Sequence, residues 1–247
     1  MCHFFPKAGG NALTSIADIL AEALSLILAA DTDLLEIVSL SLRVTLSAVV
    51  LACLIGLPLG ALCGTFRFPG RFAVILCLNA MMGLPPVVVG LIVYLMLSAS
   101  GPLGVLGLLY TPTAMIIAQT ILVTPIVAAL TRQVVEDLHG EYREQFDSLC
   151  VGPFDRLSAL LWDARYALMT VALAGFGRAV AEVGAVMIVG GNINHVTRVM
   201  TTTIALETSK GNLQLALALG VVLLVLALVV NAAVMALRGS AERAAYA

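Results

Sequence analysis

Long runs of apolar residues, interrupted by short polar segments, make up most of the chain. Residues 44–66 and 212–237 contain no Asp, Glu, Lys or Arg, and neither do the sixty residues 72–131. A helix needs about 20 mostly apolar residues to cross a hydrocarbon core ~30 Å thick, so sixty residues are too many for one crossing. The glycines and the proline in "SASGPLGVLG" (98–107) are typical of a loop and divide this run into two helices.

The pattern predicts an all-α integral membrane protein, a single transmembrane domain over residues 1–247 with five spanning helices. We place these helices at about 37–66, 72–97, 111–131, 166–190 and 212–237. The amphipathic stretch 14–30 is shorter and carries two acids, so we expect a helix at the membrane interface, with a further span as the alternative. Composition agrees, because 61% of the residues are hydrophobic and 11% charged, against about 25% charged in a typical soluble domain.

The distribution of basic residues predicts the orientation. With five spans, one side of the membrane receives eight arginines, namely Arg67, Arg71, Arg132, Arg143, Arg156, Arg165, Arg238 and Arg243, and the other side receives Lys7, Arg198 and Lys210. The positive-inside rule then predicts an outer N-terminus and a cytoplasmic C-terminus in the cytoplasmic (inner) membrane. If residues 14–30 also span, the N-terminus moves inside. The net charge of −2 and the lack of a basic tract argue against a nucleic-acid partner.

Prolines interrupt two of the predicted spans. Pro85 and Pro86 lie next to each other in "GLPPVVVG", and Pro125 lies in the following span. Proline removes a backbone donor, so the pair should kink or break its helix and Pro125 should disturb its helix less. Such breaks persist in membranes where the freed carbonyl groups face protein or a wet cavity. Two readings stay open: ordinary kinked packing helices, or irregular backbone that lines a transport pathway.

Residues 132–165 form the main water-exposed segment, with eleven of the chain's charged residues. Gly152 and Pro153 should end one helix and begin the next, because proline is well tolerated in a first helical turn. In "FDRLSALLW" the apolar residues Phe154, Leu157, Leu160 and Leu161 recur on one helical face. The pattern predicts a cytoplasmic helix-turn-helix with a small docking face. The alternative is a loop helix that folds back on its own bundle.

Two charges stand inside the apolar stretch "GFGRAVAEVGAVMIVGG". Arg178 and Glu182 are four residues apart and share one face of a continuous helix. An isolated charge at the centre of a spanning helix costs about 2.5–3.5 kcal/mol, so the pair should face the bundle interior. Gly177 and Gly184 provide small surfaces for close helix approach. We favour a structural or gating ion pair over an anion contact by Arg178 or a proton relay through Glu182.

The remaining candidates lie in the polar segment after this stretch. His195, Arg198 and Thr201 are placed where an anion would enter from outside, although a solvated histidine and a helix-capping threonine run are the plainer readings. The segment "TRVMTTTIALETS" predicts a short helix. There is no G-x-x-x-x-G-K-[ST] loop, so this chain does not bind ATP in that way. No set of residues has the spacing of a metal site or a catalytic triad, which disfavours a membrane-embedded enzyme.

The helix-turn-helix resembles the cytoplasmic loop of membrane permeases in ATP-binding-cassette importers. That loop carries a Glu-Ala-Ala helix followed by a glycine, and these positions are Phe146, Asp147, Ser148 and Gly152 here, so only the glycine is kept. The stretch "GRAVAEVGAVMIVGGNI", followed by "TRVMTTTIALETSKGNLQLALALG", is similar to the permeases of tungstate-type oxyanion importers, which are related to molybdate permeases. The resemblance covers residues 33–237.

The resemblance implies a type I importer permease that works as a homodimer by alternating access. Two cytoplasmic ATPase subunits, which bind the ATP and Mg, would dock on the 132–165 loop, and an extracytoplasmic binding protein would deliver tungstate or a similar oxyanion such as molybdate. No cofactor is implied for this chain. Because a Gly-Arg-Ala-x-x-Glu element resembles those of permeases for unlike cargoes, Arg178 and Glu182 would belong to the moving machinery. The alternatives are phosphate or another small solute as cargo, and a secondary transporter or channel that works without ATP.

Overall fold

The computed structural model describes residues 32–245, and the predicted helix at 14–30 lies outside them. The described part is helical, without strands, so the all-α class is confirmed. Its elements are α2 (Thr32–Thr65), α3 (Arg71–Met82), α4 (Pro86–Leu97), the 3₁₀ turn η1 (Gly104–Leu106), α5 (Pro112–Ser148), α6 (Pro153–Asp163), α7 (Arg165–Val180), α8 (Gly184–Gly190), α9 (Met200–Lys210) and α10 (Leu213–Ala245).

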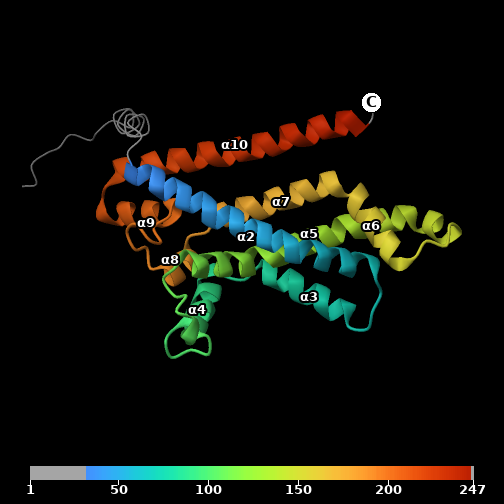
Figure 1. The fold of residues 1–247 in the computed structure, drawn as a ribbon, viewed down its shortest axis with the longest axis horizontal. Helices are drawn as coiled ribbons and strands as arrows, with labels where there is room; N and C mark the ends of the chain where they lie inside the picture. The colour runs from blue at the N-terminus through green and yellow to red at the C-terminus, as the bar shows by residue number, and fades with distance from the viewer. Residues whose placement is uncertain (1–31, 246–247) are drawn as a thin grey trace, which may run out of the picture.

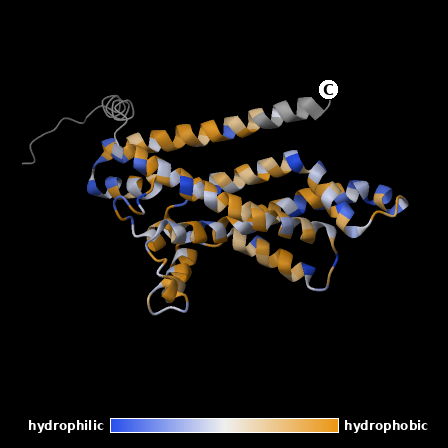
Figure 2. Cartoon of the chain, in the orientation of Figure 1, coloured by the Kyte–Doolittle hydropathy of each residue, from blue (hydrophilic) through white to orange (hydrophobic). Residues whose placement is uncertain are grey.

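Three helices are long and apolar enough to cross a membrane by themselves: α2, α5 and α10 through Ala236. Two bent pairs raise the number to five if each pair is one span. The axes of α3 and α4 differ by 102°, and those of α6 and α7 by 70°. The described residues therefore provide three to five spans. Figure 2 shows apolar residues along the middle of the molecule and hydrophilic residues gathered near α9 and α6, which Figure 1 places at opposite ends.

Helix α5 is the centre of the bundle and packs along α2 (Figure 1). Gly56, Gly60 and Gly64 follow each other at intervals of four residues on α2 and face α5. A Cβ atom at Gly56 would lie 3.0 Å from the Thr124 carbonyl oxygen, and one at Gly60 would overlap the Ala128 carbonyl oxygen. Small residues at this spacing let two helix backbones approach closely, which explains the extent of this contact.

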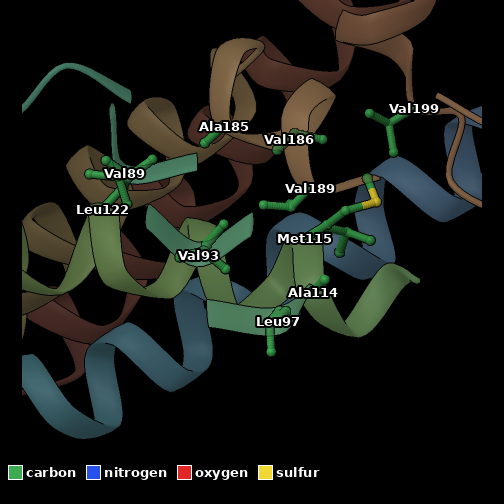
Figure 3. Packing of buried hydrophobic residues seen from close by; sticks show 12 residues of the cluster. Val89, Val93, Leu97, Ala114, Met115, Leu122, Ala185, Val186, Val189 and Val199 are labelled. Carbon is green, nitrogen blue, oxygen red and sulfur yellow. The ribbon is translucent and has the colours of Figure 1, made fainter. Parts of the chain in front are cut away.

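A cluster of buried apolar residues joins α4, α5 and α8. In Figure 3, Val89, Val93 and Leu97 of α4 lie beside Met115 and Leu122 of α5 and Ala185, Val186 and Val189 of α8. A Cβ atom at Gly90 would lie only 2.7 Å from the Ala185 Cα, so α4 and α8 are in backbone contact. The core thus fixes α8 against the helix that begins at the double proline.

Two helices have other bounds than the predicted spans. The helix predicted for 111–131 continues to Ser148, so the first half of the predicted loop is an extension of α5. The helix predicted for 166–190 is two helices, because α7 ends at Val180 and α8 begins at Gly184. By contrast, the short helix predicted after Thr197 is present as α9. The break between α7 and α8 falls at Glu182, one of the two charges in the apolar stretch.

Candidate functional site

The Arg178–Glu182 pair lies at this break and not on one continuous helix. Arg178 Nη1 donates to Glu182 Oε2 at 2.6 Å, and the Glu182 side chain is 3% exposed. The other carboxylate oxygen, Oε1, accepts the Ala185 N–H at 3.0 Å. One carboxylate oxygen of Glu182 thus binds Arg178 in the last turn of α7, and the other binds a backbone N–H in the first turn of α8. The second bond satisfies an N–H that has no helical partner because the break removes it.

The main chain at the break is also held from α9. Thr201 Oγ1 donates to the Glu182 carbonyl oxygen at 2.9 Å, so Thr201 belongs to this site and is separate from the outer cluster with which the sequence grouped it. Gly184 packs on α4, where a Cβ atom would lie 2.8 Å from Val87 Cγ2. At Gly177 no described residue outside its own stretch of helix comes within 4 Å of a Cβ position. Among the described residues, Gly184 therefore has a close neighbour on another helix and Gly177 does not.

The two broken helices meet at this point. Helix α3 ends at Met82, and Pro86 occupies the first turn of α4 after Pro85. Val87, in that first turn, is the residue that contacts Gly184. Pro125 lies farther along and is buried within an unbroken α5. As the sequence predicted, the double proline interrupts its helix and the single proline does not.

A small pocket next to the end of α7 was not predicted. Most of its lining is apolar, and its polar lining residues are Ser41 and Thr45 of α2, Gln119 of α5 and Thr201 of α9. Gln119 Nε2 donates to the Ala179 carbonyl oxygen at 3.2 Å, while its Oε1 is buried without a hydrogen-bond partner. The signal was available, because Gln119 is the only glutamine in the uncharged run 72–131. A buried amide oxygen without a donor can accept a hydrogen bond from a water or a ligand.

A second candidate site is the turn between α5 and α6. Gly152 precedes Pro153, the first residue of α6, in an extended conformation. Arg156 fixes the turn by donating to Asp147 Oδ1 and to the Val151 carbonyl oxygen, each at 2.8 Å. Its guanidinium also lies 5.8 Å from the Phe146 ring centroid. Ser148 donates to the Gln145 carbonyl oxygen within the last turn of α5.

The predicted apolar docking face of α6 is divided between two roles. Leu160 is fully buried, and Leu157 and Leu161 pack with it against Ala61 of α2 and Val135 of α5. This inner face therefore follows the alternative in which the helix folds back on its own bundle, since burial of leucine is favourable wherever a neighbour is available. Phe154 is 77% exposed. Leu149 and Trp162 are also exposed, although the periodicity did not select them.

A third cluster lies at the opposite end, where the loop after α8 meets the start of α2. His195 Nδ1 lies 2.8 Å from Glu36 Oε2, and this contact raises the pKa of His195 above its ordinary value. Asp33 completes a group of three exposed side chains whose ligand atoms lie within 4.8 Å of one another. Spacing along the chain could not reveal this group, since 159 residues separate Glu36 from His195. Arg198 borders the same cluster, and its Nε is buried without a partner.

Comparison with known proteins identifies what these sites belong to. Residues 56–242 match the family model described as "binding-protein-dependent transport system inner membrane component". A probable anion ABC transporter permease protein of Haloferax volcanii is 42% identical over 81% of this chain and 89% of its own. Two tungstate uptake system permease proteins are each 39% identical to this chain. The match to the protein of Peptoclostridium acidaminophilum covers 90% of this chain and 98% of that protein, and the match to the protein of Campylobacter jejuni covers 89% of this chain and 92% of that protein.

Proposed function

This chain belongs to the family of inner membrane components of binding-protein-dependent transport systems, and from that premise we propose that its cargo is tungstate or a similar oxyanion such as molybdate. The chain is the permease subunit of an ATP-binding-cassette importer and lies in the membrane as a multi-pass protein. It is a transporter subunit and not an enzyme, because hydrolysis of ATP belongs to a separate ATPase subunit.

The observation that carries the cargo proposal is the likeness to two tungstate permeases along almost the whole length of both partners. A match of this extent includes the outer loop, the broken helices and the cytoplasmic turn together. The secondary transporter or channel that the sequence left open does not fit this family, whose members work with a binding protein and an ATPase. Phosphate remains the alternative cargo, and the uptake experiment below measures phosphate and sulfate together with tungstate and molybdate.

The arrangement we propose has two copies of this chain, two ATPase subunits with bound ATP and Mg, and one extracytoplasmic binding protein. The N-terminus faces outward and the C-terminus the cytoplasm, so that α6 meets an ATPase and the cluster at His195 and Arg198 meets the binding protein. Exposed Phe154, Leu149 and Trp162 provide the apolar part of the ATPase contact. Aromatic residues of this kind are enriched at the centres of protein interfaces.

Movement of α6 has a direct route to the broken helices. Helix α7 begins at Arg165, immediately after the single residue that follows α6, and it ends beside Arg178 and Glu182. A push on the turn at Gly152 would therefore be carried along α7 to the contact between Gly184 and Val87. We propose that this contact shifts between two packed arrangements as the transporter alternates, with the backbone at Pro85 and Pro86 bordering the pathway. Packed interfaces switch between discrete arrangements because they do not deform continuously.

Uptake by cells tests the proposal. The chain is expressed with its ATPase and binding protein in a strain that lacks high-affinity oxyanion uptake, and cell-associated tungsten, molybdenum, phosphate and sulfate are measured by mass spectrometry and tracer counting. We expect tungstate and molybdate uptake that requires a hydrolysis-competent ATPase. A matched strain with an ATPase that cannot hydrolyse ATP is the control. Uptake of phosphate or sulfate in preference to tungstate would contradict the cargo, and uptake in the control strain would contradict the mechanism.

A further inference from the structure

A cavity of about 410 Å³ lies at the α6 end of the molecule, and its lining includes Asp147 and Arg156, which fix the turn at Gly152. It lies between the turn that joins α2 to α3, the extension of α5, and the first turn of α6 (Figure 1). Its charged lining residues are Arg67, Arg71, Arg143, Arg156, Glu136 and Asp147. Four arginines face two carboxylates, so the cavity carries an excess of positive charge.

The positive charge is only partly neutralised within the chain. Arg71 pairs with Glu136 at 2.9 Å, and Arg156 pairs with Asp147 at 2.8 Å. Arg143 lies 4.0 Å from the second oxygen of Asp147, which is the limit of an ion pair. Arg67 has no ion pair with any residue that the structure describes. Two guanidinium groups are therefore available to an added anion without breaking a tight pair.

The same cavity contains a polar atom that lacks a partner. His139 lines it, and its Nδ1 is buried without a hydrogen bond. Arginine forks bind tetrahedral oxyanions through paired hydrogen bonds, and a histidine N–H supplies a further donor. The chemistry of the lining thus suits a phosphate or another tetrahedral oxyanion group.

The stretch 59–74 contributes residues both to this cavity and to a separate apolar groove, and the groove indicates which kind of molecule carries the oxyanion group. Leu59, Leu62 and Cys63 of α2, together with Phe66, Phe68 and Val74, line a space of about 400 Å³ whose exposed lining is apolar. Phe72, at the start of α3, is 80% exposed. Basic residues close to the end of a span are typical of the cytoplasmic surface of a membrane. The apolar lining of the groove suits an acyl chain.

We infer that these two spaces bind one anionic phospholipid of the cytoplasmic leaflet, with its phosphate among Arg67, Arg143 and His139 and an acyl chain in the Leu59–Val74 groove. Basic pockets between helices on the cytoplasmic side recognise lipid headgroups by this combination of charge and apolar surface. The bound lipid would join the α2–α3 turn to the α5–α6 turn and so stabilise the surface on which an ATPase docks. This inference rests on the proposed orientation of the chain and does not depend on which oxyanion is the cargo.

Native mass spectrometry of the purified permease–ATPase complex tests the inference. Phosphatidylglycerol and phosphatidylethanolamine with identical acyl chains are titrated at low salt. We expect selective binding of phosphatidylglycerol and a loss of about 30-fold in its affinity in Arg67→Gln/Arg143→Gln, since each basic residue near a membrane surface contributes about 1 kcal/mol and tenfold is about 1.4 kcal/mol. Arg67→Lys/Arg143→Lys should keep most of the affinity. Arg165 lies outside the cavity, and its guanidinium stacks on Trp162 and Tyr166. The Arg165→Gln variant should therefore bind phosphatidylglycerol as tightly as the wild type.

Two further arms identify the source of the oxyanion group. Val74→Trp fills the apolar groove without altering charge, and we expect it to weaken phosphatidylglycerol binding in a complex that still elutes at the wild-type position. Inorganic phosphate and tungstate are added as competitors, and we expect neither to displace the lipid at millimolar concentration. Equal binding of the two lipids, or an equal loss in Arg165→Gln, would overturn the inference. Displacement by inorganic phosphate with no effect of Val74→Trp would assign the cavity to a free oxyanion and overturn the lipid reading.

Discussion

The pairing of Arg178 with Glu182 predicts an unequal response to removal of either partner. Arg178→Met leaves a carboxylate that is 3% exposed without its cation, whereas Glu182→Gln leaves a guanidinium that is 28% exposed and can be rehydrated. Loss of one partner of a buried pair costs about 3–5 kcal/mol, and loss of a hydrogen bond to a charged group costs about 1.5–3 kcal/mol. Glu182→Gln also keeps an oxygen that can accept the Ala185 N–H. We therefore expect Arg178→Met to be the more damaging change by about 1–2 kcal/mol.

A double-mutant cycle measures this difference. The wild-type complex, the two single variants and Arg178→Met/Glu182→Gln are purified in detergent, and their thermal stability and binding-protein-stimulated ATP hydrolysis are compared. The double variant removes both charges, so it should recover part of the stability that Arg178→Met loses. Equal costs for the two single variants, with no recovery in the double variant, would refute the reasoning from burial. A well-assembled Arg178→Met complex with an altered preference between tungstate and phosphate would instead indicate that Arg178 contacts the cargo.

Three further changes test the other sites. A Cβ atom at Gly152 would meet the Asp155 carboxylate at 3.2 Å, so the Gly152→Trp variant should still insert and assemble. We expect it to lose most of the stimulation of ATP hydrolysis by the binding protein. Full stimulation would contradict the coupling role. Gly60→Val forces α2 from the α5 backbone and should lower the melting temperature far more than Gly220→Val, a glycine with no neighbour within 4 Å; equal effects would contradict the packing argument. The pKa of His195 is raised by Glu36, so the contact should stabilise the loop after α8 fully below about pH 6.5 and be lost as the pH rises through the raised pKa. Hydrogen exchange of residues 191–199, corrected for intrinsic rates, should accelerate over that range, and the same pH dependence in His195→Gln would exclude the contact as its cause.

Hydrophobic patterning predicted the main elements because each apolar run has few alternatives in a membrane. All but one residue of each of the runs 44–66 and 212–237 lie in α2 and α10, and the double proline separates α3 from α4. These features depend on neighbouring residues along the chain. Proline acts on its own helix, and an uncharged run of sufficient length is favourable only as a buried or lipid-exposed helix.

The break between α7 and α8 could not be predicted in this way. A Glu four residues after an Arg is equally compatible with a continuous helix, which is how the sequence was read. The break is held by the Thr201 hydroxyl from α9 and by the contact of Gly184 with Val87 from α4, and both partners are distant in sequence. The same reason explains Leu160, whose periodicity marks an apolar face but does not say whether the neighbour is an ATPase or Val135 of the same chain.

The geometry of the break also bears on whether Arg178 selects the cargo. Both oxygens of Glu182 are already occupied, one by Arg178 and the other by the Ala185 N–H. For Arg178 to bind an anion as its main partner, it would have to leave a carboxylate that is almost fully buried, at a cost of about 3–5 kcal/mol. A transport pathway needs weak binding so that the ion can leave, and it cannot supply this energy at every cycle. We infer that the pair holds the junction of α7 and α8 together while α6 and α7 move, and that choice among oxyanions is made chiefly by the binding protein.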